Sequence, residues 1–104
     1  MLKEISRLIS KGIRQGDIAC RWGGEEFLIL YSVADDRLLP EITERIRHSI
    51  ANLPCSFEGH DFAVSVTIGF SLCKDASDFG SCAKRADEAL YRGKKEGKNR
   101  VVRS

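Results

Sequence analysis

The stretch from Phe62 to Leu72 restricts the fold of this 104-residue chain more than any other segment. Apolar residues alternate there with small or polar ones, and this period of two places every second side chain on the same face of a β-strand. The apolar members are Phe62, Val64, Val66, Ile68, Phe70 and Leu72. The segment is therefore predicted to be one strand of a sheet with one buried face.

The remaining elements follow from shorter patterns. Apolar residues at helical spacing predict helices at 2–13, from near Asp35 to before Pro54, and at 81–95. Short apolar or β-branched runs next to turn residues predict strands at 18–22, 27–31, 55–57 and 99–103. The order α-β-β-α-β-α-β indicates one α+β sandwich with a largely antiparallel sheet. A split βαβ architecture normally begins with a strand, so the first strand is expected to be missing.

Composition narrows the class of protein. The chain is 42% hydrophobic and 31% charged, which suits one small domain with one core. No apolar run approaches the roughly 20 residues that span a membrane. The charged start of the chain is unlike a signal peptide. A cytoplasmic location is expected, and one form of it is that the chain is the cytoplasmic end of a longer sensor protein.

The four cysteines are Cys20, Cys55, Cys73 and Cys82. They form no C-x-x-C pair, so the sequence gives no pattern for a zinc site. A disulfide framework is typical of small secreted proteins, and nothing else in the sequence indicates secretion. The cysteines are predicted to be reduced thiols that fill the core.

The segment Trp22–Phe27 (Trp-Gly-Gly-Glu-Glu-Phe) carries the clearest chemical signal. Two adjacent glycines between predicted strands permit a tight turn with positive φ and let a ligand approach the backbone. The two glutamates that follow are of the residue type that holds Mg²⁺ together with substrate phosphates. Six basic residues between Arg92 and Arg103 would suit such phosphates. The alternative is an ordinary surface hairpin and a solvated basic face.

The residue sequence of this motif resembles the signature of one protein family. Gly23–Phe27 is the GGEEF form of the signature of GGDEF domains, the diguanylate cyclase module. The similarity continues at Asp17–Trp22, at Val66–Gly69 and from Ala86 to Arg100, so it covers nearly the whole chain. The resemblance implies a ferredoxin-like, nucleotidyl-cyclase palm-type fold, and residues 1–104 are expected to form a single partial GGDEF domain that lacks the first strand.

The activity that the resemblance implies is the condensation of two GTP molecules into cyclic di-GMP. Two subunits face each other in this reaction, so a homodimer is expected. Gly23 and Gly24 would lie against the nucleotide, and Glu25 would bind Mg²⁺ (or Mn²⁺) and help to deprotonate the attacking hydroxyl. Glu26 would be an auxiliary catalytic acid. Phosphoryl transfer relies on positioning and charge neutralisation, which agrees with these roles.

The basic end would bind the triphosphate. By the resemblance Lys94 and Lys98 are the two cations that clamp it. Their spacing is one helical turn, so both are expected to reach the same phosphate group. Lysine at the second position keeps the charge but lacks the bidentate fork of arginine.

An inhibitory site for the product is also implied. Arg14 and Asp17 fit the R-x-x-D pattern of that site at the usual distance before the signature, and Arg45 matches its further arginine. The arginines would contact guanine and phosphate, and the aspartate would accept from guanine. The alternative is a surface arginine beside an aspartate that begins a strand.

The absent first strand would carry a metal-binding aspartate and precede the residues that recognise guanine. The fragment alone is therefore predicted to be catalytically inactive, and the neighbours of that strand are expected to have unpaired edges. The fragment is expected to fold by borrowing a strand or by symmetric pairing.

Two further hypotheses remain. One is a non-catalytic cyclic di-GMP receptor that uses Arg14, Asp17 and Arg45. The other is a nucleic-acid-binding domain, which is disfavoured because the sheet lacks interleaved exposed aromatics. Nucleic acid is therefore not expected among the partners.

Overall fold

The computed structural model describes residues 2–14, 16–32, 36–74 and 76–104. The helices in these ranges are α1 (Leu2–Gly12), α2 (Leu39–Ala51) and α3 (Phe79–Lys95), with short 3-10 turns at Asp36–Leu38 and Ala76–Asp78. The strands are β1 (Ile18–Gly23), β2 (Glu26–Tyr31), β3 (Cys55–Phe57), β4 (His60–Phe62), β5 (Thr67–Leu72) and β6 (Val101–Arg103). Asp35, near which the second helix was predicted to begin, lies outside the described residues.

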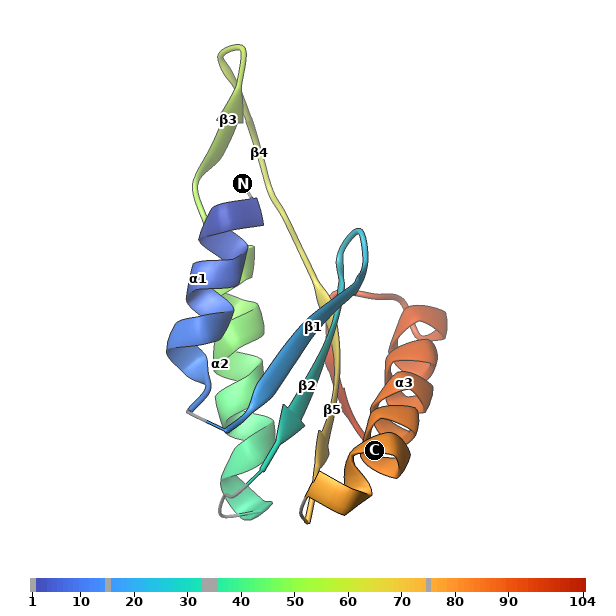
Figure 1. Cartoon of the computed structure of the whole chain (residues 1–104). Coiled ribbons are helices and arrows are strands. Elements are labelled where there is room, and N and C mark those ends of the chain that lie inside the picture. Colours follow the sequence, from blue (N-terminus) through green and yellow to red (C-terminus); the bar gives the residue numbers. More distant parts are fainter. Residues whose placement is uncertain (1, 15, 33–35, 75) are drawn as a thin grey trace.

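The main sheet has the strand order β1-β2-β5-β6. The predicted hairpin is confirmed, because β1 and β2 pair antiparallel. The α+β class is confirmed too, but the prediction of a largely antiparallel sheet is wrong, since β2–β5 and β5–β6 are parallel. The reason is the connections: a helix lies between the members of each parallel pair and returns the chain to the same end of the sheet (Figure 1).

The central strands of this sheet leave no gap between them. β2 and β5 pair directly along their whole length, from Glu26 opposite Thr67 to Tyr31 opposite Leu72. Their backbone groups therefore find partners within one chain. The neighbours of the missing strand were expected to have unpaired edges, which a borrowed strand or symmetric pairing would cover. For β2 and β5 this expectation is wrong, because the two strands pair with each other.

The alternating run from Phe62 to Leu72 is split between two sheets. Phe62 belongs to the small β3–β4 hairpin and is 40% exposed, whereas β5 begins only at Thr67. Val64 and Val66 are buried in the segment that connects the two sheets. The pattern identified the strand correctly from Thr67 onward, but its first part crosses from the hairpin into the core.

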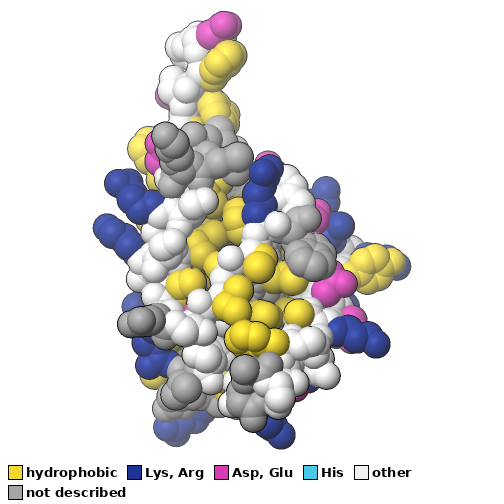
Figure 2. All heavy atoms as spheres, viewed as in Figure 1, with side chains coloured by type: hydrophobic (Ala, Val, Ile, Leu, Met, Phe, Trp, Pro, Cys, Tyr) yellow, Lys and Arg dark blue, Asp and Glu magenta, His cyan; other side chains and the backbone are white. Residues whose placement is uncertain are grey.

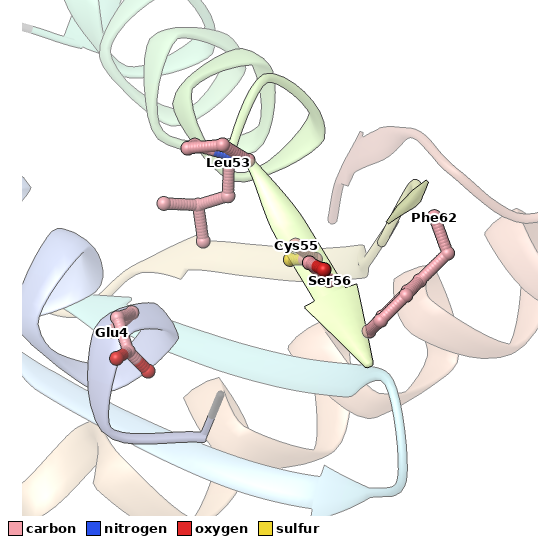
Figure 3. Close-up of a pocket in the computed structure, with 6 residues that line it drawn as sticks. Glu4, Leu53, Cys55, Ser56 and Phe62 are labelled. Carbon is pink, nitrogen blue, oxygen red and sulfur yellow. The ribbon is translucent and has the colours of Figure 1, made fainter. Parts of the chain in front are cut away.

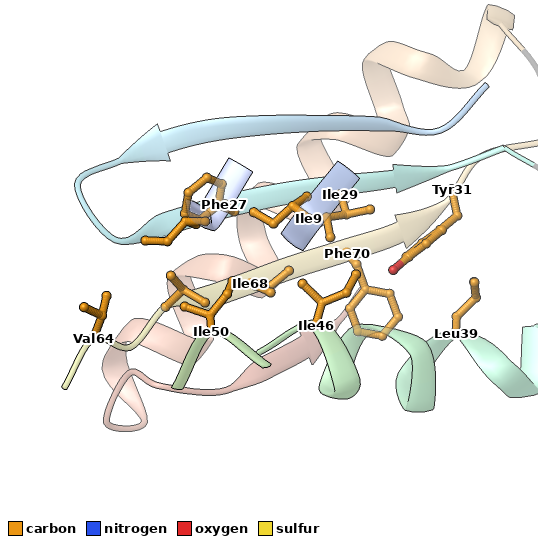
Figure 4. Packing of buried hydrophobic residues seen from close by; sticks show 12 residues of the cluster. Ile9, Phe27, Ile29, Tyr31, Leu39, Ile46, Ile50, Val64, Ile68 and Phe70 are labelled. Atoms are coloured by element: carbon orange, nitrogen blue, oxygen red, sulfur yellow. The ribbon is translucent and has the colours of Figure 1, made fainter. Parts of the chain in front are cut away.

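Helices cover both faces of the main sheet (Figure 1). α1 and α2 pack on the face that carries Phe27, Ile29 and Tyr31, and this makes the larger core (Figure 4). α3 packs on the opposite face, against Leu28 and Leu30. Successive residues of β2 thus point into different cores, as the pleat of a strand requires.

β5 is buried on both faces, so the prediction of a strand with one buried face is wrong. Its small and polar residues, Thr67, Gly69 and Ser71, are all buried as well. A Cβ at Gly69 would lie only 2.7 Å from the backbone nitrogen and 2.8 Å from the Cβ of Leu90. Small residues alternate in β5 because α3 approaches the strand closely there.

One polar pair is built into the larger core. The Tyr31 hydroxyl lies 2.7 Å from Thr43 Oγ1, which itself donates to the Leu39 carbonyl at 2.7 Å. Since the Thr43 hydrogen is used in that bond, Tyr31 is the donor to Thr43. Burial raises the pKa of the Tyr31 hydroxyl, which keeps it protonated as this donor role requires.

The smaller core contains a disulfide bond. Cys73, just after β5, is bonded to Cys82 in the first turns of α3, with their Cα atoms 5.6 Å apart. The prediction of reduced thiols is therefore wrong for this pair, while Cys20 and Cys55 are free. The nine-residue separation showed no recognisable motif, and the pair forms because the end of β5 and the start of α3 face each other.

The β3–β4 hairpin projects from the body of the molecule (Figures 1 and 2). Phe57 is 69% exposed on it, and apolar side chains are visible along it in Figure 2. None of the described helices is long and apolar enough to cross a membrane.

Candidate functional site

A two-residue turn, Gly24-Glu25, joins β1 to β2, and Gly23 is the last residue of β1 opposite Glu26. The positive φ that Gly23 and Gly24 would permit is not used, because neither glycine adopts it. Space is the constraint at Gly23, where a Cβ would lie 2.6 Å from Glu26 Oε1. A Cβ at Gly24 would meet nothing within 4 Å, so this glycine is open on the surface.

The two glutamates of the motif have different surroundings. Glu25 is exposed at the turn, and its main-chain carbonyl accepts from Thr67 N–H at 2.9 Å. Glu26 is partly buried at the start of β2, and its carboxylate lies 3.3 Å from the Lys94 ammonium. The fold therefore brings the acidic hairpin to the basic end of α3, two segments nearly 70 positions apart in the sequence.

The basic end of α3 forms a turn of unusual backbone conformation. The helix ends at Lys95, and Gly97, Lys98 and Asn99 follow with φ of 125°, 61° and 50°. Lys98 N–H caps the helix by donating to the Gly93 carbonyl at 2.9 Å. Lys98 thus lies beyond the helix, so the expectation that it sits one helical turn from Lys94 is wrong, although it stays next to the same helix end.

The acidic residues of the hairpin are not clustered around one point with other possible metal ligands of the described residues. No group of three His, Cys, Asp or Glu side chains gathers among them. Glu25 offers one exposed carboxylate, and Glu26 is engaged by Lys94. Mg²⁺ is commonly held by one or two carboxylates together with substrate phosphates, so the hairpin fits a shared metal position but not a cage built by protein alone.

The predicted product-site residues lie on two segments: Arg14 and Asp17 in the turn between α1 and β1, and Arg45 in the middle of α2. Asp17 accepts from Arg14 N–H and from Ser32 N–H, each at 2.9 Å, and from the Ser32 hydroxyl at 3.3 Å. One carboxylate oxygen therefore closes the turn before β1, and the other ties that turn to Ser32, just after β2. This matches the structural alternative for Asp17, while a carboxylate with four lone-pair positions keeps some capacity to accept further bonds.

Arg45 lies on α2 and is 3.6 Å from Glu41, with 73% of its side chain exposed. The end of α1 approaches α2 closely, since a Cβ at Gly12 would contact the Ile46 side chain. A shallow surface pocket between these helices includes Gly12 and Arg45. Arg14 follows this end of α1, so the fold places it in the region of Arg45, but no contact between described residues joins Arg45 to Arg14 or Asp17.

A separate pocket lies under the projecting hairpin (Figure 3). Its lining residues are Glu4, Leu53, Pro54, Cys55, Ser56 and Phe62. None of these was predicted as a site residue. The sequence-predicted residues therefore form open surface features rather than this pocket.

Sequence reasoning missed three residues at the meeting point of hairpin and basic turn. Thr67 contacts both, and Arg47 donates to the Asn99 side chain at 2.8 Å. In the alternating pattern Thr67 falls on the polar side of the strand, and this pattern contains no information about which backbone group its hydroxyl contacts. Only the position of β5 between β2 and β6 reveals the contact.

A mixed sheet with helices on both faces, and an acidic glycine hairpin set against a basic helix end, defines the palm type of nucleotidyl-cyclase fold. A family model described as "Diguanylate cyclase, GGDEF domain" matches residues 1–100. The chain therefore belongs to the GGDEF domain family of diguanylate cyclases.

Curated relatives agree. Diguanylate cyclase A of Treponema denticola is 34% identical over 105 residues, which cover 100% of this chain and 28% of that protein. Diguanylate cyclase DosC of Escherichia coli K12 is 32% identical over 102 residues, which cover 97% of this chain and 22% of that protein. The chain thus spans less than a third of the length of these relatives.

Solved structures show the same fold. The GGDEF domain of DgcB from Caulobacter crescentus, in complex with c-di-GMP, has a TM-score of 0.74 at 28% identity over 95% of this chain and 60% of that one. The diguanylate cyclase SiaD from Pseudomonas aeruginosa, in complex with its activator SiaC, has a TM-score of 0.78 at 29% identity over 99% of this chain and 40% of that one.

Proposed function

We propose that these residues form part of the GTP site of a diguanylate cyclase, which condenses two GTP molecules into cyclic di-GMP. The observation that carries the proposal is the 3.3 Å ion pair between Glu26 and Lys94, which joins the signature hairpin to the basic helix end. A triphosphate needs cations, and its metal needs carboxylates, so this pairing brings both kinds of group to one place.

Each residue has a proposed part in binding. The backbone at Gly23 and Gly24 lies against the nucleotide, and the open surface at Gly24 leaves room for it. Lys94 and Lys98 bind phosphate oxygens, with Lys94 released from Glu26 when the anion takes its place. Glu25 holds Mg²⁺ or Mn²⁺, and Glu26 remains beside it as an auxiliary acid. The metal, when bound, supplies neutralisation of the charge on the transferring phosphate.

The described residues alone are proposed to be inactive in condensation. The metal-assisted reaction needs a further carboxylate beside those of the hairpin, and no group of three His, Cys, Asp or Glu side chains gathers among the described residues to supply it. The reaction also requires two GTP molecules held face to face. Activity is therefore assigned to a cytoplasmic homodimer of a longer protein in which the site is complete.

Two measurements test this proposal. Isothermal titration calorimetry with GTP and Mg²⁺ is expected to detect binding to the 104-residue chain, and Lys94→Ala should weaken that binding by roughly ten- to a hundredfold because it removes a charged hydrogen bond. Lys95→Ala is the matched control, because the Lys95 ammonium lies 4.9 Å from the Tyr91 ring centre rather than at the hairpin.

Incubation of the chain with GTP and Mg²⁺, followed by chromatography, is expected to yield no cyclic di-GMP. Production of cyclic di-GMP by these residues alone would contradict the proposed incompleteness. Equal loss of binding in the Lys94 and Lys95 variants would contradict the assigned site.

A second candidate is a cyclic di-GMP receptor that uses Arg14, Asp17 and Arg45. It is favoured by the close approach of the end of α1, which Arg14 follows, to the part of α2 that carries Arg45, and by the structural relative DgcB, whose GGDEF domain was solved with c-di-GMP. Calorimetry with the dinucleotide separates the two candidates. Arg14→Ala is expected to abolish binding to this site, whereas Glu25→Ala should leave it unchanged.

A further inference from the structure

Thr67 lies at the point where the two halves of the proposed GTP site meet. It is the first residue of β5, stands opposite Glu26 in the parallel register with β2, and is 3% exposed. Its main-chain N–H donates to the Glu25 carbonyl at 2.9 Å. The backbone of Thr67 therefore fixes the hairpin that carries both glutamates.

The side chain of Thr67 reaches the other half. Its Oγ1 accepts from Asn99 N–H at 3.1 Å, in the turn that follows α3. Its Cγ2 faces the end of the same helix, since a Cβ at Gly93 would lie 3.0 Å from it. One buried residue thus touches the hairpin through its backbone and the basic turn through its hydroxyl and methyl groups.

The basic turn needs such support. Lys98 and Asn99 are both non-glycine residues in the left-handed region, at φ of 61° and 50°. A residue with a Cβ is strained in this region, so the conformation persists only where contacts hold it. Lys98 is bonded to Gly93, and Asn99 is bonded to Thr67, so each of the two has its own anchor.

A second tie holds Asn99 from the other side. Arg47 of α2 donates to Asn99 Oδ1 at 2.8 Å and is itself bonded to Glu44 on the same helix. That bond orients the guanidinium, and the side chain of Arg47 is only 17% exposed. Asn99 is therefore fixed through its main chain by β5 and through its side chain by α2.

We propose that Thr67 is a positioning residue for nucleotide binding, whose hydroxyl holds the left-handed turn so that Lys98 faces the hairpin and Lys94. This inference rests on the proposed GTP site. Thr67 touches no ligand itself; it acts by fixing the distance between the acidic hairpin and the cationic turn. Without the hydroxyl, Lys98 would sample conformations that point away from the phosphates.

Two substitutions in the 104-residue chain separate this role from packing. Thr67→Val keeps the shape, the methyl group and the strand preference of Thr67 but removes the hydroxyl. Thr67→Ser keeps the hydroxyl but removes the methyl group that faces Gly93. A residue needed only for packing would suffer more from Ser than from Val, whereas a positioning hydroxyl predicts the reverse order for binding.

The first readout needs no ligand. Amide hydrogen exchange at Asn99, followed by NMR, is expected to be roughly three- to tenfold faster in Thr67→Val than in the wild type, the equivalent of one net hydrogen bond. Thr67→Ser is expected to exchange like the wild type at this amide. Exchange within β2 serves as the internal reference for general destabilisation.

The second readout is GTP affinity with Mg²⁺ by calorimetry. Thr67→Val is expected to weaken binding roughly three- to tenfold, and Thr67→Ser to retain it even if its melting temperature falls. Wild-type affinity in Thr67→Val, or an equal loss in both variants, would overturn the inference. A wild-type chain that binds no GTP would overturn the proposed function instead. Unchanged exchange at Asn99 in Thr67→Val would then also overturn the assignment of Thr67.

Discussion

Glu26 is restricted on two sides, and this separates the roles of the two acids in the motif. Its carboxylate occupies the space that a Cβ at Gly23 would need, and it is paired with Lys94. Glu25 has neither restriction and is exposed at the turn. Of the two, Glu25 is therefore the carboxylate that can turn toward a metal without breaking a contact of the fold.

Gly24 offers a way to separate binding from folding. Because a Cβ there would contact nothing within 4 Å and φ is not positive, Gly24→Ala is expected to change the free energy of unfolding by less than about 1 kcal/mol. The same methyl group would occupy the surface that is proposed to face the nucleotide, so GTP affinity should fall at least tenfold. Urea unfolding and calorimetry on the same sample check both statements. A large loss of stability with unchanged affinity would contradict this assignment.

Asp17 shows how far residue-level prediction reaches. Its place in an R-x-x-D pattern could be read from the sequence, and so could a structural alternative at the start of a strand. The bonds to Ser32 could not, because Ser32 follows β2 and meets Asp17 only once the β1–β2 hairpin has formed. Local spacing identifies such a residue, but the partners of its side chain depend on pairing along the sheet.

At the scale of elements, local patterns predicted the helices and the β1–β2 hairpin, while the sheet directions required non-local information. The pairing of β2 with β5 joins strands separated by α2 and a second hairpin. The local sequence of each strand does not predict that β2 and β5 pair. It also does not predict that α3 covers the second face of β5. For the same reason the Phe62–Leu72 pattern could not reveal that Phe62 belongs to a different sheet.

The close packing of α3 on β5 predicts a strong effect at one glycine. Gly69→Ala places a methyl group against the backbone of α3, which cannot move aside as a side chain would, so a loss of about 3 kcal/mol in unfolding free energy is expected. Gly80→Ala is the matched control within α3, since a Cβ there meets nothing within 4 Å and helix propensity should rise. Urea denaturation measures the free energy of unfolding of both variants. That of Gly69→Ala should fall below the wild-type value, and that of Gly80→Ala should equal or exceed it.

The Cys73–Cys82 disulfide links β5 to α3 across a short loop. Closing a loop of this size restricts the unfolded chain, so its reduction is expected to lower the free energy of unfolding by about 2–3 kcal/mol. Urea unfolding with and without a phosphine reductant measures the change. A variant with Cys20 and Cys55 replaced by serine should respond to the reductant as the wild type does. No response in either protein would show that the bond is absent in solution.

At the scale of the whole molecule, direct pairing of β2 with β5 lets one chain complete its central sheet. The folded state should therefore not depend on association. The melting temperature is expected to stay constant over a wide range of protein concentration, whereas a fold that borrows a strand from a second copy would melt higher at higher concentration. Differential scanning calorimetry at several concentrations, with size-exclusion chromatography alongside, makes the comparison.

The projecting β3–β4 hairpin has a practical consequence. Its turn, at Glu58 and Gly59, stands clear of both cores, and a Cβ at Gly59 would meet nothing within 4 Å. Exposed turns of this kind accept inserted sequence more readily than any buried position. The turn lies on a different segment from the GGEEF hairpin and the basic turn, so it is the natural place to graft a fluorophore or an affinity tag that reports on the protein while leaving its chemistry alone.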